Sequence, residues 1–149
     1  MKMTKKTLCS IVLTVAPTVT LAGTKERVDV AITNLPGGSS QGLCSERFSF
    51  EIGLGGVDLS DLTVRFDFFD KKGVKFYSAT DSVSLDGSEG GHYKEAYVES
   101  KELCQEEVAK VSISSAIGKV NGKTVDLVSG RMIHVEKFVP VDVVIPDHK

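Results

Sequence analysis

The sequence predicts an all-β domain built as a β-sandwich. Apolar and polar residues alternate in several short segments, turn residues separate these segments, and only one stretch is helix-compatible. Side chains of a strand point alternately to its two faces, so this alternation indicates strands with one buried and one exposed face. We expect about seven to nine short strands, a pattern typical of sandwiches of the immunoglobulin or fibronectin type III kind.

The clearest hairpin runs from Leu62 to Tyr77. Its sequence is LTVRFDFFDKKGVKFY, and its first half alternates apolar and polar side chains. The turn residues at 70–73 precede a second strand-like run that ends at Tyr77, which predicts two antiparallel strands joined by a short loop.

Two further strands are expected before this hairpin. Val28, Val30 and Ile32 alternate in residues 25–33, and residues 43–54 alternate in the same way. The Pro- and Gly-containing segment at residues 34–40 predicts a loop between these strands. Residues 58–61 are polar and are interpreted as a turn.

The segments after the hairpin are shorter. Residues 82–85 predict a short strand, residues 86–91 a flexible turn, and residues 92–99 another strand. The acidic segment at residues 99–108 is compatible with one or two turns of helix.

The last third of the chain returns to strand alternation. One face of the strand at residues 111–117 is expected to carry Val111, Ile113, Ser115 and Ile117. Asn121-Gly122 then predicts a tight hairpin, because both residues tolerate positive φ. Residues 132–138 and 141–145 complete the fold. Pro140 cannot donate to a strand ladder, which places the last segment at a sheet edge or at a crossing point.

Strand alternation also predicts a shared core. A register slip by one residue would turn each apolar set to water, so the inward faces are strongly specified. The expected core residues are Phe48, Phe50, Ile52, Val64, Phe66, Phe68, Val111 and Ile113.

Residues 1–22 are expected to form a secretory signal peptide. The segment begins with three lysines, continues with an apolar run at residues 8–15 and ends in Thr20-Leu21-Ala22, which offers small residues at a cleavage site. We expect export to the periplasm or beyond it and cleavage after Ala22. Residues 23–149 are then long enough for a single domain.

Charge and motif searches exclude several classes of function. Without the three signal-peptide lysines, Lys and Arg fall from 18 to 15 against 20 Asp and Glu, which disfavours nucleic acid and membrane insertion. Neither the histidines nor the serines lie in a catalytic or metal-binding motif, and the aspartates lack EF-hand spacing. We expect no enzyme activity, no cofactor and no metal site.

Two cysteines remain in the mature chain, Cys44 and Cys104. Oxidising compartments favour disulfides, and only one pairing is available here. The chain-entropy estimate for closing a loop of this size is about 4 kcal/mol. We therefore predict a Cys44–Cys104 disulfide; two free buried thiols are the alternative.

Binding modules of several classes fit these features. One is a secreted effector that recognises a host protein. Another is a pilus or adhesin-type subunit that exposes a sheet edge for strand addition. A third is a periplasmic chaperone-like sandwich or an inhibitor. Residues 23–27 are too short for a donor strand, which disfavours a pilus subunit. A chaperone of the pilus type would need two sandwich domains, whereas this chain is expected to form one.

Three segments together resemble the interleukin receptor mimic protein A (IrmA) family of small secreted bacterial proteins. They are FDFFDKKGVKFYS, GGHYKEAYVESKELC and GKVNGKTVDL. The resemblance implies a fibronectin type III-like fold and a domain-swapped homodimer. It also implies virulence-related binding to host cytokine receptor ectodomains, the interleukin-2, -4 and -10 receptors among them.

Residue type suggests four candidate anchors for a protein partner. Tyrosine and arginine are common at interface hot spots, and the candidates are Tyr77, Tyr93, Tyr97 and Arg131. The alternative is that the tyrosines are partly buried sandwich residues and that Arg131 is a solvated turn residue.

Overall fold

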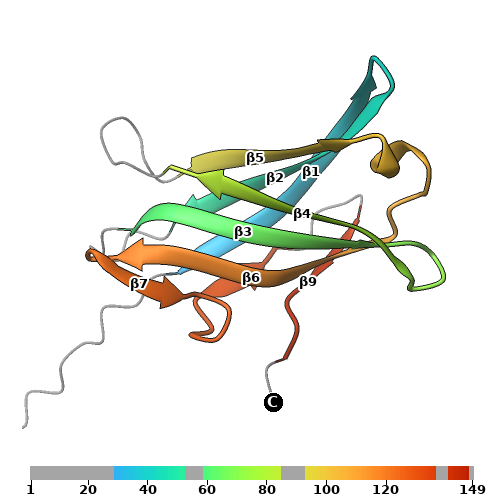
Figure 1. Cartoon of the computed structure of the whole chain (residues 1–149). Helices are drawn as coiled ribbons and strands as arrows, with labels where there is room; N and C mark the ends of the chain where they lie inside the picture. Colours follow the sequence, from blue (N-terminus) through green and yellow to red (C-terminus); the bar gives the residue numbers. More distant parts are fainter. Residues whose placement is uncertain (1–28, 53–58, 85–92, 137–140, 148–149) are drawn as a thin grey trace, which may run out of the picture.

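The computed structural model of the chain describes residues 29–52, 59–84, 93–136 and 141–147. Within these ranges, nine strands and one short 3₁₀ helix, η1 (Glu102–Cys104), form two packed sheets (Figure 1). The all-β sandwich that the sequence predicts is confirmed. The expected signal peptide and the turn at residues 86–91 lie outside the described residues.

The first sheet has the strand order β5-β2-β1-β8. Its strands are β1 (Val30–Ser40), β2 (Leu43–Ile52), β5 (Tyr93–Ser100) and β8 (Ile133–Val135). β2 is antiparallel to both β1 and β5, whereas β8 runs parallel to β1. The sheet therefore joins the earliest described strand to one of the last.

The second sheet has the order β4-β3-β6-β7, and β9 also pairs with β6. Its strands are β3 (Leu59–Phe69), β4 (Lys75–Val83), β6 (Lys110–Val120), β7 (Lys123–Asp126) and β9 (Asp142–Val144). β7 is antiparallel to β6, and β9 runs parallel to it. β4 pairs with β3 and so adds a strand to the second sheet. Variable-type immunoglobulin sandwiches also add strands to the sheet that contains their third strand.

Phenylalanine rings from both sheets fill the centre of the sandwich. Phe48 of β2 stacks on Phe66 of β3, with ring centroids 4.4 Å apart and an interplanar angle of 17°. Phe50 and Phe68 pack around this pair. The predicted core is confirmed, since all eight residues are at most 7% exposed: Phe48, Phe50, Ile52, Val64, Phe66, Phe68, Val111 and Ile113.

The predicted loop at residues 34–40 is wrong, because β1 continues through it. Gly38, Ser39 and Ser40 pair with β2 after an irregularity in the register. The actual turn is Gln41-Gly42, with φ angles of 51° and 78°. Positive φ at two central residues matches the twist of a hairpin. A Cβ on Gly37 would lie 1.9 Å from the Ser45 carbonyl oxygen, so only glycine fits there.

Two strand boundaries also differ from the prediction. The turn predicted at residues 58–61 is wrong for residues 59–61, because β3 begins at Leu59. Residue 58 lies outside the described residues. Asp61 has a φ of 51°, and the register shifts between Ser60 and Thr63, so the irregularity is a bulge within the strand. The separate strand at residues 82–85 is also wrong, because β4 extends to Val83.

A bulge in β6 overturns the predicted face of its second half. Arg65 of β3 lies opposite Ser115, but Phe66 lies opposite Ile113, so one residue of β6 is extra. An extra residue reverses the alternation beyond it. Ala116 is consequently buried, whereas Ser115 and Ile117 lie on the other face.

The remaining turns agree with their sequence signals. Asp70 Oδ1 accepts hydrogen bonds from the backbone N–H groups of Lys72 and Val74, both at 2.8 Å, and closes the β3–β4 hairpin. Asn121 and Gly122 have φ angles of 48° and 75° and join β6 to β7. The helix-compatible segment forms the single turn η1, and its Leu103 is buried in the core.

Phe66→Ala should lower the free energy of unfolding by about 3–5 kcal/mol, because it removes a fully buried ring and leaves a cavity. Urea denaturation measures the loss. Thr80→Ala, at an exposed position of β4, is the control and should change stability by less than about 0.5 kcal/mol. Equal effects of the two substitutions would contradict the assigned core.

Candidate functional site

The outer face of the first sheet carries exposed aromatic and charged side chains. Buried Ala96 and Val98 alternate on β5 with residues that point outward, among them Tyr93 and Tyr97, which are 51% and 52% exposed. The register of β5, β2, β1 and β8 aligns these residues in rows across the sheet. The rows are Tyr97–Arg47–Leu35, Glu95–Ser49–Thr33 and Tyr93–Glu51–Ala31–His134.

Glu95 joins the two tyrosines of β5. The hydroxyl of Tyr93 donates to Glu95 Oε1 at 2.9 Å, and the hydroxyl of Tyr97 donates to Glu95 Oε2. The three residues lie at alternate positions of one strand, so their side chains share one face. We call Tyr93, Glu95, Tyr97 and Arg47 the tyrosine–carboxylate cluster.

Arg47 of the neighbouring strand completes the tyrosine–carboxylate cluster. Its Nη1 lies 3.9 Å from Glu95 Oε2. The hydrogen bonds from Tyr97 and Tyr93, together with the Arg47 charge, hold the pKa of Glu95 below its usual value. The bond to Glu95 in turn raises the pKa of Tyr93. Glu95 is therefore a carboxylate at neutral pH, and Tyr93 keeps its proton.

The outer face of the first sheet is predominantly acidic beyond the cluster. His134 Nδ1 lies 2.9 Å from Asp29 Oδ1, and these two residues line a shallow hollow with Glu51 and Glu136. Among the described residues, the carboxylates of the face are Asp29, Glu51, Glu95, Glu99 and Glu136, and its basic side chains are Arg47 and His134.

The outer face of the second sheet has a different chemistry. Asp67 accepts a hydrogen bond from Ser78 at 2.6 Å and lies near Arg65 and Lys75. Burial acts to raise the pKa of Asp67, but the hydrogen bond and the two positive charges outweigh it and hold that pKa below its usual value. The carboxylate is thus compensated locally, which distinguishes it from the acids of the first sheet.

The structure separates the four anchor candidates. Tyr93 and Tyr97 lie together on β5. Tyr77 is half-buried on β4, with its ring centroid 5.7 Å from that of Phe68, and so contributes to the core. Arg131 is exposed in the segment before β8, has a φ of 53°, and lines a hollow with Val128, Ile133 and Asp147.

Neither Glu95 nor Arg47 was predicted as a site residue from the sequence. The pattern Tyr-x-Glu-x-Tyr at residues 93–97 was available as a signal, because alternate residues of a strand share a face. Arg47 had no such local signal. Its place opposite Tyr97 depends on the pairing of β2 with β5, which the sequence does not specify locally.

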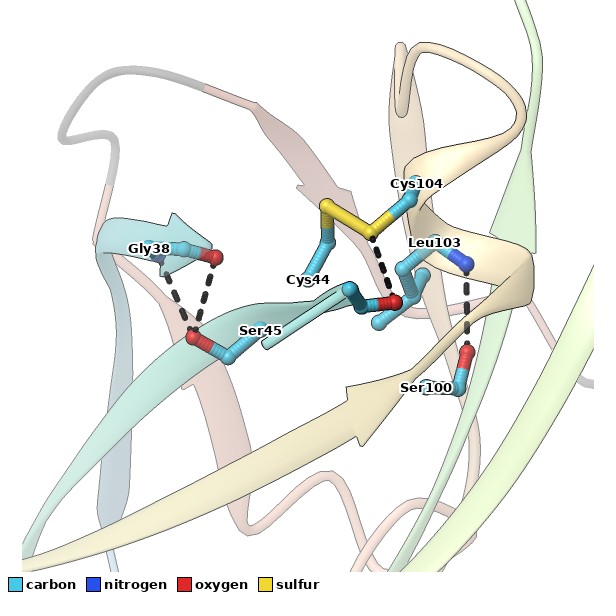
Figure 2. The surroundings of a disulfide bond; sticks show 7 residues. Gly38, Cys44, Ser45, Ser100, Leu103 and Cys104 are labelled. Carbon is cyan, nitrogen blue, oxygen red and sulfur yellow. Dashed lines mark hydrogen bonds between the residues drawn. A yellow bond between two sulfur atoms is a disulfide. The ribbon is translucent and has the colours of Figure 1, made fainter. Parts of the chain in front are cut away.

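A disulfide fixes one end of the outer face. Cys44 at the start of β2 is bonded to Cys104 of η1, with Cα atoms 5.1 Å apart (Figure 2). The Ser100 hydroxyl accepts a hydrogen bond from Leu103 N at 3.1 Å, and the Cys104 Sγ lies 3.7 Å from the Gly42 carbonyl oxygen. The pairing of Cys44 is the one expected from the cysteine count. It ties the end of β5 to the β1–β2 hairpin.

The described residues offer few features of other functional classes. Within them, His, Cys, Asp and Glu side chains form no group of three or more suited to a metal ion. The same part of the chain has no helix with the length and hydropathy needed to span a membrane. An exposed cluster on a sheet face remains as the candidate site.

The chain matches one known protein family over most of its length. The family described as "IrmA: interleukin receptor mimic protein A" matches residues 38–135, more than half of the 149-residue chain. The chain belongs to the IrmA family. The matched segment includes both cysteines of the disulfide and the whole tyrosine–carboxylate cluster.

A solved structure agrees with the family assignment. The chain is similar to IrmA from Escherichia coli with a TM-score of 0.63 and 20% sequence identity, over 79% of this chain and 99% of that one. At this identity the likeness shows the shared fold. No curated protein matches the chain.

Reduction of the disulfide should destabilise the domain by up to about 4 kcal/mol, because the unfolded chain loses a loop closure of 60 residues. Thermal unfolding with and without dithiothreitol should show a melting temperature lower by on the order of 10 °C after reduction. The double variant C44A/C104A is the control, since its melting temperature should not respond to the reductant. An unchanged melting temperature in the natural sequence would contradict a stabilising role.

Asp67 should contribute to acid sensitivity. A folded-state pKa below the unfolded value gives stability that is present above the unfolded pKa, about 4, and is lost as pH falls through the folded pKa. Asp67→Asn should therefore lower stability at pH 7 by about 1 kcal/mol and reduce the loss below pH 4. Urea midpoints from pH 7 to pH 2 test this, with exposed Asp142→Asn as the control.

Proposed function

We propose that this protein is an exported interleukin receptor mimic that binds host cytokine receptor ectodomains and modulates immune signalling. The single observation that carries the proposal is the family match across residues 38–135. The interleukin-2, -4 and -10 receptors are the first partners to test, because the family resemblance implies them. The protein acts by binding and has no catalytic activity.

The outer face of the first sheet supports a binding role. Protein interfaces draw much of their affinity from a few tyrosine and arginine side chains at their centre. The tyrosine–carboxylate cluster supplies two exposed tyrosines, and Arg47 lies beside them at 36% side-chain exposure. A standard interface needs about 800 Å² on each partner, so the contact would extend from this cluster across β2 and β1.

The molecular form remains part of this proposal. Cleavage after Ala22 would accompany export and release residues 23–149 as one domain. The homodimer, with exchange of terminal strands, has a structural motive in the short strand β9, which pairs with one end of β6. Short terminal strands are readily exchanged between identical chains.

Surface plasmon resonance of the mature protein against purified interleukin-2, -4 and -10 receptor ectodomains tests the proposal. We expect saturable binding to at least one ectodomain with a dissociation constant below about 10 μM, which corresponds to roughly 7 kcal/mol. An unrelated β-sandwich protein is the control for nonspecific adsorption.

A second assay of the mature protein distinguishes receptor binding from the main alternative, a pilus or adhesin-type subunit. A pilus-subunit incorporation assay measures whether the protein enters fibres. Absence of binding at tens of micromolar to all three ectodomains, together with incorporation into fibres, would replace receptor binding with an adhesin-type function.

A further inference from the structure

We propose that the tyrosine–carboxylate cluster docks a basic segment of the protein partner, with a lysine or arginine side chain placed on Glu95 between the rings of Tyr93 and Tyr97. The inference rests on the proposed function in that it names the surface and the chemistry by which a receptor would be held. It concerns the outer face of β5 and β2, which share the register Arg47↔Tyr97 and Ser49↔Glu95.

Charge complementarity selects a basic partner. Glu95 and Glu99 lie on β5, and Glu51 lies beside Tyr93 on β2, so carboxylates surround the exposed rings. Arg47 compensates only part of this charge, at 3.9 Å from Glu95. Complementary charge raises association rates and suppresses partners of the wrong sign. An acidic or neutral segment would gain no such attraction here.

The cluster offers both contacts that a cation uses on a protein surface. A carboxylate accepts charge-assisted hydrogen bonds, and each of its oxygens can accept more than one donor. Tyr93 and Tyr97 each fill one acceptor position on Glu95 and leave others open. Tyrosine faces attract ammonium and guanidinium groups through cation–π interaction. One cation can therefore contact the carboxylate and a ring at the same time.

The cluster is ordered before any partner arrives. Tyr93 and Tyr97 are separated by about 13 Å along the strand at its usual rise of roughly 3.3 Å per residue. Their hydroxyl groups nevertheless converge on the same carboxylate, so the rings lean toward Glu95. Side chains that are already fixed lose little conformational freedom on binding, which favours affinity.

The position of β5 gives a partner access to this face. β5 is the outer strand of the order β5-β2-β1-β8. The disulfide between Cys44 and Cys104 holds the end of β5 against the start of β2, so the two strands present one rigid surface. Asp67 on the opposite sheet is a poorer site for a cation, because Arg65 and Lys75 already lie near its carboxylate. The two exposed tyrosines among the described residues, Tyr93 and Tyr97, both lie on the first sheet.

Titration of ¹⁵N-labelled mature protein with a hexalysine peptide tests the surface without any receptor. Amide shift changes should saturate and concentrate at residues 45–51 and 93–99. Glu95→Gln and the pair Y93A/Y97A should each weaken the peptide by at least about fivefold, since each removes a contact to the cation. Glu106→Gln, which neutralises an exposed carboxylate outside this face, should leave the affinity unchanged.

Shift changes spread over the acidic loops, or equal weakening by Glu95→Gln and Glu106→Gln, would overturn the inference. Tyr93→Phe with Tyr97→Phe keeps the rings and removes their bonds to Glu95, so it separates ring stacking from ordering of the carboxylate. Circular dichroism of each variant should match the natural protein, because the substituted side chains lie on the surface.

Binding to a receptor ectodomain is the second test of the tyrosine–carboxylate cluster. On an ectodomain that binds the natural protein, Glu95→Lys should weaken affinity by more than tenfold and Glu106→Gln should not, and higher salt should weaken the natural protein. Equal affinities of all variants would overturn the inference and leave the proposed function standing. If hexalysine maps to the cluster but no receptor ectodomain binds, the basic-segment site stands and the proposed receptor binding is overturned. Loss of a dimer mass in Glu95→Lys on light scattering would assign the face to a second copy and overturn the inference.

Discussion

The ring stack between Phe48 and Phe66 couples the two sheets and decides which side chains face outward. The two rings come from β2 and β3, with centroids 4.4 Å apart, and other core aromatic rings surround them. Once Phe48 and Phe50 point inward, strand alternation turns Arg47 and Ser49 outward. The pairing of β2 with β5 then brings Arg47 beside Tyr97. The exposed cluster is thus a geometric consequence of the packed core.

Local sequence patterns predicted the core and the tight turns because burial and backbone conformation act over a few residues. The alternation around Phe66 and the Asn121-Gly122 turn are of this kind. The failures arose where pairing between distant strands overrides local preference. Residues 34–40 extend a hairpin despite Pro36 and its glycines, and the extra residue in β6 shifts every later side chain to the other face. A single sequence does not reveal such registers.

The candidate site was predictable only in part. Residue type and exposure suggested Tyr93 and Tyr97, whereas Tyr77, chosen by the same criterion, packs on Phe68 in the core. Glu95 could be found from its alternate spacing, but Arg47 required the cross-strand register. Three segments, rather than any local chemical motif, pointed to the family, and the family match across residues 38–135 confirmed it. Binding surfaces built from common side chains leave little trace in a single sequence.

The parallel pairing of β8 with β1 can form only late in synthesis of the chain. Val30 of β1 lies opposite Ile133, so the edge of this early strand cannot be covered until the ribosome has added about a hundred further residues. At roughly 5–20 residues per second, this takes on the order of ten seconds. The nascent chain spends that interval with an open strand edge, a feature that favours pairing with other chains. The β1 edge of the first sheet is therefore completed only when the last part of the chain is available.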